Sequence, residues 1–251
     1  MMHPEKYTSS PVMTANKLFG LWHPKAQSSS PPDTVLVLMH GRNFMFAQSQ
    51  LRAKPIAWYP GQMCQPGWRR SGPHITKPAG VGGPAIAVDV ELMATWGVKS
   101  IVLVGQAGGF PPAAKSGDIV VVQKAMRNDG VSDHYLPPEK WANPSGVLTH
   151  KILKSLKEKV SQVHTGPVWT TSAIFRETSA EVEDYAADGV LAVDMEAASL
   201  FTVANIVGVR AAAIFVISDL LKPNHHQMAP DQNQVEQKLN QVTSHLITLF
   251  D

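Results

Sequence analysis

Residues 101–109 read Ile-Val-Leu-Val-Gly-Gln-Ala-Gly-Gly, an apolar run that passes into a glycine-rich segment. A continuous run of Val, Ile and Leu is typical of a strand buried on both faces. Similar runs predict strands at 35–39, 119–122, 190–193 and 211–217, with an extended segment at 163–171. Helices are predicted between and after these strands, at 85–96, 147–159, 179–187, 196–207 and 231–250. Buried strands that alternate with helices predict an α/β fold whose sheet is covered on both faces.

Two parts of the chain give a weaker signal. Residues 41–78 contain scattered aromatics and prolines and are predicted to form short strands and loops. Residues 1–33 are polar and contain several prolines, which predicts an N-terminal lead-in or an arm that reaches a neighbouring subunit. Neither a compositional break nor an internal repeat interrupts residues 34–251, which are therefore predicted to form one domain.

Composition and charge narrow the class of protein. The formal net charge is +2 and there is no long basic run, so a nucleic-acid partner is not expected. Neither a signal peptide nor a membrane span is predicted, and a single cysteine, Cys64, fits a reducing compartment such as the cytoplasm. Only 17% of the residues are charged, against roughly 25% in an average soluble domain. This shortage predicts that another copy of the chain covers part of the surface.

The glycine-rich segment Gly105-Gln106-Ala-Gly108-Gly109 follows a predicted strand and is predicted to form a loop. Small residues at the carboxyl end of a strand allow backbone N–H groups to approach an anion or a sugar, although a plain tight turn fits equally. The spacing matches neither a Walker loop nor a dinucleotide-binding fingerprint. The polar segment 127–135 also follows a strand, and its Asp129-Gly130 pair predicts a turn.

Two further segments place carboxylates where a strand ends. Asp194 and Glu196 flank Met195 between a strand and a helix, where a carboxylate can accept two sugar hydroxyls or simply cap the helix. Asp219 follows the strand 211–217 and is either an N-cap or a partly desolvated general acid, because desolvation raises a carboxyl pKa. The nearby pair His225-His226 has no second ligand cluster, so a solvated loop is predicted rather than a metal site.

Taken in order, five segments resemble the nucleoside phosphorylase family, which includes purine nucleoside phosphorylase, uridine phosphorylase and related nucleosidases. The most specific segment is Val193-Asp-Met-Glu-Ala-Ala198. The other four are Gly80-Val-Gly-Gly-Pro84, the segment 105–109, the Gly117-Asp118 turn and the segment 127–135. The resemblance implies a single-domain, three-layer α/β/α fold with a central mixed, mostly parallel sheet. It also implies a homodimer or hexamer that acts on a small-molecule nucleoside without a cofactor.

The resemblance assigns roles to particular residues. Glu196 is expected to hold the ribose 2′- and 3′-hydroxyls, with Met195 packed on the sugar. Phe175 is expected to stack on the base, and Asp219 to protonate N7 of a departing purine. The presence of Ser218 and Asp219 favours purines, because uridine phosphorylases typically lack the acid. Further contacts to the base are expected from Arg176, Glu177 and Ser218.

The phosphate-binding pattern of the family is altered in this chain. Phosphorolytic members usually carry an arginine at the position of Leu103 and a Ser or Thr at the position of Gln106. Phosphate contacts are therefore expected from Gly41 and Arg42 after the first strand, and from Gly105 and Gln106. Arg127 or a neighbouring subunit could add positive charge. Inorganic phosphate is the expected co-substrate, a nucleosidase that uses water is the alternative, and a non-catalytic nucleoside-binding or storage protein is a third hypothesis.

Overall fold

The computed structural model describes residues 3–22, 30–57, 59, 62–67 and 72–251. One sheet runs through the molecule in the order β11-β10-β6-β8-β9-β5-β1-β4-β3-β2, with β7 paired to β6. The strands are β1 Thr34–Leu38, β2 Lys54–Pro55, β3 Gln62–Gln65, β4 His74–Lys77, β5 Ser100–Gly109, β6 Ile119–Asn128, β7 Trp141–Ala142, β8 Val163–Thr171, β9 Ala192–Asp194, β10 Arg210–Lys222 and β11 His225–Met228.

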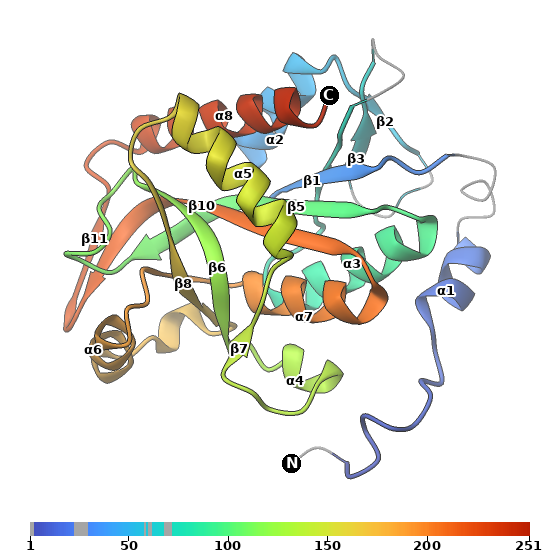
Figure 1. The fold of residues 1–251 in the computed structure, drawn as a ribbon, viewed down its shortest axis with the longest axis horizontal. Coiled ribbons are helices and arrows are strands. Elements are labelled where there is room, and N and C mark those ends of the chain that lie inside the picture. Colours follow the sequence, from blue (N-terminus) through green and yellow to red (C-terminus); the bar gives the residue numbers. More distant parts are fainter. Residues whose placement is uncertain (1–2, 23–29, 58, 60–61, 68–71) are drawn as a thin grey trace.

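The helices lie on both faces of this sheet (Figure 1). α2, α5 and α8 pack on one face, and α3 and α7 pack on the other. The helices are α1 Ala15–Trp22, α2 Gly41–Gln50, α3 Gly83–Trp96, α4 Ser132–Tyr135, α5 Gly146–Lys159, α6 Ser179–Ala187, α7 Ala197–Val207 and α8 Gln232–Leu249, and η2 Ile174–Arg176 is a 3₁₀ helix. The predicted single-domain α/β/α fold with a mixed sheet is confirmed.

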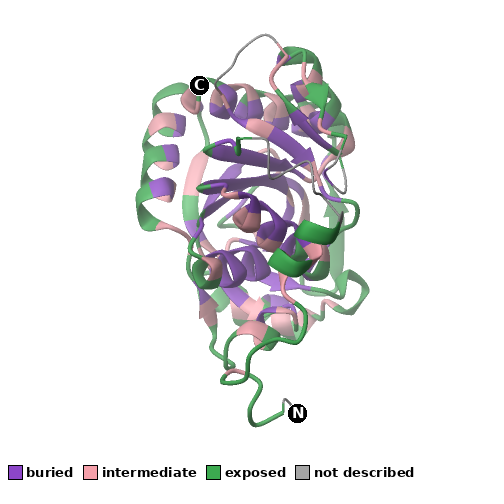
Figure 2. Cartoon of the chain, turned by 90° about the vertical axis from the view of Figure 1, so that its right-hand side faces the viewer, coloured by how far each residue is buried: buried purple, intermediate pink, exposed green. Residues whose placement is uncertain are grey.

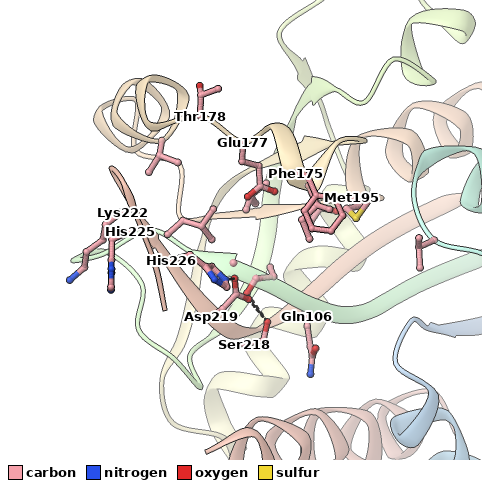
Figure 3. Close-up of a pocket in the computed structure, with 18 of the residues that line it drawn as sticks. Gln106, Phe175, Glu177, Thr178, Met195, Ser218, Asp219, Lys222, His225 and His226 are labelled. Atoms are coloured by element: carbon pink, nitrogen blue, oxygen red, sulfur yellow. Dashed lines mark hydrogen bonds and ion pairs between the residues drawn. The ribbon is translucent and has the colours of Figure 1, made fainter. Parts of the chain in front are cut away.

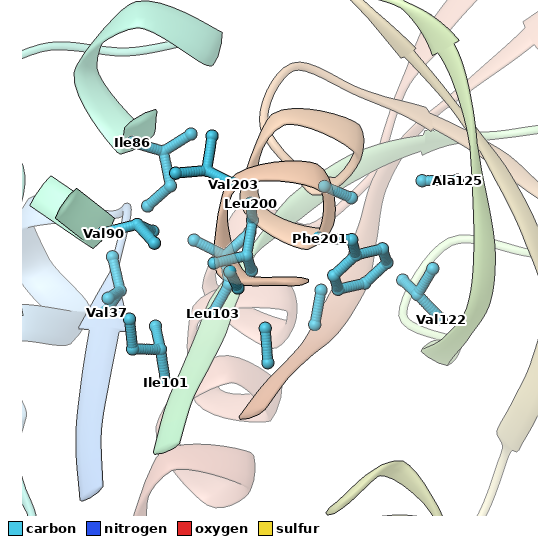
Figure 4. Packing of buried hydrophobic residues seen from close by; sticks show 14 of the residues in the cluster. Val37, Ile86, Val90, Ile101, Leu103, Val122, Ala125, Leu200, Phe201 and Val203 are labelled. Carbon is cyan, nitrogen blue, oxygen red and sulfur yellow. The ribbon is translucent and has the colours of Figure 1, made fainter. Parts of the chain in front are cut away.

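Alternating side chains of the strands fill two separate cores. On β5, Ile101 and Leu103 point toward α3 and α7, while Val102 and Val104 point toward α2, α5 and α8. Figure 4 shows Leu103 beside Leu200 of α7. Each such side chain, fully buried, contributes roughly 1.5–3 kcal/mol. Figure 2 shows the result, with buried strands inside and exposed residues on the outer faces of the helices.

The glycine-rich segment 105–109 is not a loop, so that prediction is wrong. β5 continues through it, and β10 pairs beside it as far as Gly109. At Gly108 and Gly109 the other edge of β5 pairs with β9. The pairings β5–β9, β9–β8, β8–β6, β6–β10 and β10–β5 close a ring of strands. The glycines allow side chains of neighbouring strands to come close, because a Cβ at Gly108 would meet Leu221 Cδ1 at 2.3 Å.

Residues 41–50 form the helix α2 where loops and short strands were predicted. The helix is held by polar contacts to α8 that local sequence does not reveal. The buried side chain of Asn43 donates to Asn240 Oδ1 at 2.9 Å and accepts from Thr243 Oγ1 at 3.1 Å. Beyond this helix, short strands were correctly predicted in the described parts of 51–78, as β2, β3 and β4.

Residues 1–33 include a short helix that lies against the domain. Phe19 of α1 is buried in the same core as α3, and the Tyr7 hydroxyl donates to the carbonyl of Asp133 at 2.7 Å. In the part of the chain that the structure describes, no helix is long and apolar enough to cross a bilayer.

Candidate active site

A pocket of about 750 Å³ lies where the second half of β5, the end of β10 and the β9–α7 junction meet. The segment 174–179 and the β1–α2 junction complete its wall. Figure 3 shows side chains from these segments, and from β11, converging on it. Of the residues predicted from the sequence, those that line the pocket are Gln106, Phe175, Glu177, Met195, Glu196, Ser218 and Asp219.

The sequence left open whether Asp194 and Glu196 cap a helix or accept sugar hydroxyls, and the structure gives the capping role to Asp194. The carboxylate of Asp194 accepts from the backbone N–H groups of Glu196 at 2.8 Å and Ala197 at 2.6 Å, and therefore caps α7. Thr170 Oγ1 donates to its other oxygen at 2.6 Å. Burial and the nearby Glu196 carboxylate together raise the pKa of Asp194 to about 7, although these donors lower it. Because Asp194 caps the helix, the Glu196 side chain is available to the pocket.

Glu196 is held by the glycine-rich segment before α3. Its Oε1 accepts from the backbone N–H of Gly82 at 2.7 Å. Burial raises the pKa of Glu196, while the N–H donors of Gly82 and Met195 lower it. Gly82 has a φ of 83°, a backbone conformation that residues with a side chain rarely adopt. The sequence 80–84 therefore positions an oxygen acceptor in the pocket.

Replacing Gly82 by Ala is expected to destabilise the fold by about 1–3 kcal/mol, because alanine at this φ is strained. The shifted N–H would also release Glu196, so the KM for a sugar-containing ligand should rise. Gly80→Ala is the matched control, since an added Cβ there meets Ala85 Cβ at an ordinary 3.6 Å. Thermal unfolding and steady-state kinetics of both variants test this, and equal effects of the two changes would contradict it.

Asp219 lies at a β-bulge near the end of β10. Ser218 Oγ donates to its Oδ1 at 2.6 Å, and His226 Nε2 lies 2.9 Å from its Oδ2 (Figure 3). The side chain is only 19% exposed. Gly108 lies beside it on β5, where a Cβ would come within 3.2 Å of Asp219 Oδ2. The missing side chain at Gly108 thus leaves room for the carboxylate.

The segment between η2 and α6 forms the wall facing Asp219. Thr178 and Glu181 form a reciprocal capping box at the start of α6, which fixes this segment. Burial and the neighbouring Asp219 carboxylate raise the pKa of Glu177 to about 7, although His226 lowers it. Phe175 is 96% exposed and lines the pocket, so one face of its ring is open to a ligand. Arg176 is exposed and does not line the pocket.

The predicted phosphate contacts are not all brought together. Gln106 lines the pocket and so does His40, whereas Gly41, Arg42 and Gly105 do not. The Arg42 side chain is 73% exposed and pairs with Glu236 of α8 at 3.1 Å. None of the described residues lining the pocket is an arginine.

The Arg127 guanidinium is hydrogen-bonded to nearby residues of its own segment and not directed to the pocket. Its side chain is 1% exposed, and the guanidinium donates to the side chains of Ser132 and Asp133 and to the carbonyls of Ser132, Leu136 and Pro137. These contacts fold residues 127–137 into a compact turn around α4, and the arginine does not line the pocket. Among the described residues, no group of three or more His, Cys, Asp or Glu is placed to hold a metal ion.

The sequence of this chain matches a known family over most of its length. The model of the phosphorylase superfamily matches residues 63–250. The chain belongs to this superfamily. The resemblance to nucleoside phosphorylases predicted from the sequence is therefore confirmed.

Superfamily members similar to this chain carry different names. A guanosine phosphorylase of Halorubrum lacusprofundi is 28% identical over 159 residues, which cover 63% of this chain and 66% of that protein. A uridine phosphorylase of Haemophilus influenzae is 23% identical over 72% of this chain and 77% of that protein. A purine nucleoside phosphorylase of Bacillus cereus is 32% identical over 56% of this chain and 60% of that protein. These names divide between purine and pyrimidine nucleosides, so similarity alone leaves the base unresolved.

Two solved structures share the fold of this chain. A uridine phosphorylase of Vibrio fischeri superposes with a TM-score of 0.75 at 19% identity, covering 87% of this chain and 91% of that chain. An AMP nucleosidase of Bacteroides thetaiotaomicron also gives 0.75, at 20% identity, covering 94% of this chain and 97% of that one. One architecture therefore accompanies both phosphorylase and nucleosidase names.

His226 is one of the pocket residues to which the sequence analysis gave no role, together with His40, Thr178 and Lys222. Residues 225–228 form β11 rather than the predicted loop. Lys222 and His225 are opposite each other, so Pro223 and Asn224 make a two-residue hairpin turn. Asn224 has a φ of 56°, and proline followed by a residue with positive φ is typical of a type II turn. The Pro-Asn pair was thus a signal for a hairpin that places His226 beside Asp219.

Proposed function

We propose that this protein cleaves the N-glycosidic bond of purine nucleosides. The observation that carries the proposal is that Glu196 and Asp219 line the same pocket. The Glu196 carboxylate suits the two hydroxyls of a sugar diol, and the Asp219 carboxyl group suits a base that departs from the sugar. Such a reaction passes through a ribosyl group with oxocarbenium character, which requires a held sugar, a nucleophile and a stabilised leaving group.

Glu196 and Met195 are proposed to bind the ribose. With Oε1 held by Gly82, the remaining acceptor sites of the Glu196 carboxylate face the pocket and suit the 2′- and 3′-hydroxyls. Hydrogen bonds to an ionised carboxylate are stronger than neutral ones. Met195 also lines the pocket, where its thioether can pack against the sugar.

Other residues of the same pocket are proposed to bind the base. Phe175 offers an exposed aromatic face for stacking, and Glu177 and Ser218 offer polar atoms to the base edge. Asp219 is proposed to donate a proton to N7 as the bond to the sugar breaks. The electron pair of that bond then enters a neutral purine instead of an anion, which lowers the barrier.

Inorganic phosphate is proposed as the nucleophile, and no cofactor is needed. Met39 and His40 line the pocket directly before α2 begins, and a helix N-terminus offers unpaired backbone N–H groups to an anion. Gln106 lines the same pocket and adds an amide donor. Several relatives named as phosphorylases support this choice.

Hydrolysis by water is the second candidate, and two observations favour it. Leu103 is fully buried in the core against α7, at the position where phosphorolytic members usually carry an arginine. Arg42 pairs with Glu236 outside the pocket. Bidentate recognition of phosphate normally uses an arginine fork. We therefore propose that a second subunit of a homo-oligomer supplies this charge if phosphate is the nucleophile.

Removing phosphate distinguishes the two nucleophiles. With inosine as substrate, phosphorolysis predicts that hypoxanthine release stops in phosphate-free buffer and that ribose 1-phosphate forms when phosphate is present. Both products can be followed by chromatography. An unchanged rate without phosphate, with free ribose as product, would establish hydrolysis and exclude the phosphorylase proposal.

A further inference from the structure

His226 lies on the same face of the β10–β11 hairpin as Asp219. The register places His226 directly opposite Leu221, two residues from Asp219 on the same strand. Side chains two residues apart on a strand share a face, so Asp219 and His226 are diagonal neighbours. The separation of 2.9 Å between His226 Nε2 and Asp219 Oδ2 is a hydrogen bond.

The hairpin that carries His226 is hydrogen-bonded to the first residue of α6. Ser179 Oγ donates to Oδ1 of the turn residue Asn224 at 3.0 Å. The backbone N–H of Asn224 donates in return to Ser179 Oγ at 2.8 Å. Ser179 is the first residue of α6, directly after the Thr178 capping residue. The position of His226 relative to Asp219 is therefore set by the strand pairing and by this contact at the turn.

Both oxygens of Asp219 already have partners. Ser218 donates to Oδ1, and the imidazole of His226 contacts Oδ2. If His226 donates, Asp219 is a carboxylate without a proton to give. A proton for the base must then come through one of the two partners. A serine hydroxyl does not lose its proton near neutral pH, whereas an imidazole does. The His226 side chain is 55% exposed, so it can exchange protons with solvent.

We propose that Asp219 and His226 share one proton and that His226 supplies it to Asp219 during cleavage; this inference rests on the proposed function. As the C1′–N bond breaks, its electron pair moves into the purine ring. N7 takes a proton from Asp219, and Asp219 takes one from His226 Nε2. The attacking water or hydrogen phosphate loses a proton on forming its bond to C1′. Solvent exchange at His226 restores the pair, so protons balance over the cycle. His226 is thus a positioning and proton-supplying residue.

Other charged groups lie near Asp219 and His226, and their ionisation also affects the pH dependence of the cleavage rate. Glu177, between η2 and α6, interacts with both Asp219 and His226, and Glu181 of α6 interacts with Glu177. Lys222 and His225 pair at the tip of the hairpin, and both also line the pocket. Glu177→Gln is therefore needed as a second background, because its carboxyl titrates in the same range as an imidazole.

The test compares two nucleosides in wild type, His226→Gln and the control His150→Gln, which changes an exposed histidine of α5 outside the pocket. Inosine needs a proton at N7, whereas 7-methylinosine already carries a fixed positive charge there. His226→Gln keeps an amide donor but cannot transfer a proton. We expect it to lower kcat/KM for inosine about 10–100-fold near pH 8, because Asp219 then has no neighbouring group that can supply a proton. The same loss is expected in the Glu177→Gln background.

The controls separate proton supply from structural damage. Cleavage of 7-methylinosine by His226→Gln should stay within about threefold of wild type, since no proton is required. His150→Gln should behave as wild type with both nucleosides, because His150 does not line the pocket. An equal loss on both substrates, or an unchanged kcat/KM for inosine, overturns the inference while leaving the proposed function intact. If the wild type releases base from neither nucleoside, the proposed function fails, and this inference with it.

Discussion

Replacing Asp219 by Asn is expected to slow the cleavage of inosine by about 10²–10⁴-fold, the usual contribution of a general acid. Asparagine has the same shape and can keep a hydrogen bond to Ser218, but it carries no acidic proton. The rate falls because the purine must then leave as an anion. The measurement is single-turnover hypoxanthine release at saturating enzyme, which isolates the chemical step from product release.

The same variant should cleave 7-methylinosine almost as fast as the wild type. This substrate bears its charge at N7 before the bond breaks, so it bypasses the acid. A loss of less than about threefold on inosine would remove Asp219 from the mechanism. An equally large loss on both substrates would assign Asp219 to binding or folding instead.

Replacing Glu196 by Gln is expected to lower kcat/KM for inosine by about 10²–10⁴-fold. Each hydrogen bond to a charged group contributes about 1.5–3 kcal/mol, and two ribose hydroxyls share this carboxylate. The amide oxygen of glutamine can still accept from the Gly82 N–H, so the fold is retained. Steady-state kinetics with inosine and with 2′,3′-dideoxyinosine test the assignment.

The dideoxy substrate is the control for Glu196, because it lacks both hydroxyls and should be nearly insensitive to the substitution. The wild type should also lose activity on inosine as pH falls through the Glu196 pKa, since only the ionised form accepts both hydroxyls. Burial raises that pKa above its usual 4.5, so the loss should begin at a higher pH than for an exposed glutamate. Equal sensitivity of both substrates to Glu196→Gln would place this residue away from the ribose.

Several elements could be predicted because their signals are local. Residues 163–171 and 179–187 are strand and helix with the predicted bounds, as β8 and α6. The segment 193–198 shows its strand-to-helix change in its own apolar pattern, and Gly97 ends α3 at a φ of 108°. The convergence of Met195, Glu196 and Asp219 on one pocket follows from placing strand ends of an α/β sheet together.

Other features depend on contacts between distant parts of the chain. The glycines at 105–109 were interpreted as a turn because glycine usually interrupts a strand, yet pairing with β10 and β9 keeps them extended. α2 is stabilised through Asn43 by residues about 200 positions away. His226 lies beside Asp219 only because a two-residue turn reverses the chain. None of these pairings appears in the local apolar pattern.

The central claim, cleavage of purine nucleosides, is tested most directly by measuring base release from inosine, guanosine, adenosine and uridine in phosphate buffer. The account predicts release of a purine base from at least one of the first three, at a rate at least about 10²-fold above that of uracil release, because the acid Asp219 serves only a purine leaving group. Faster release of uracil than of any purine base would contradict it. Nucleoside binding by calorimetry with no release of any base would also contradict it, and would instead identify a non-catalytic binding protein with this fold.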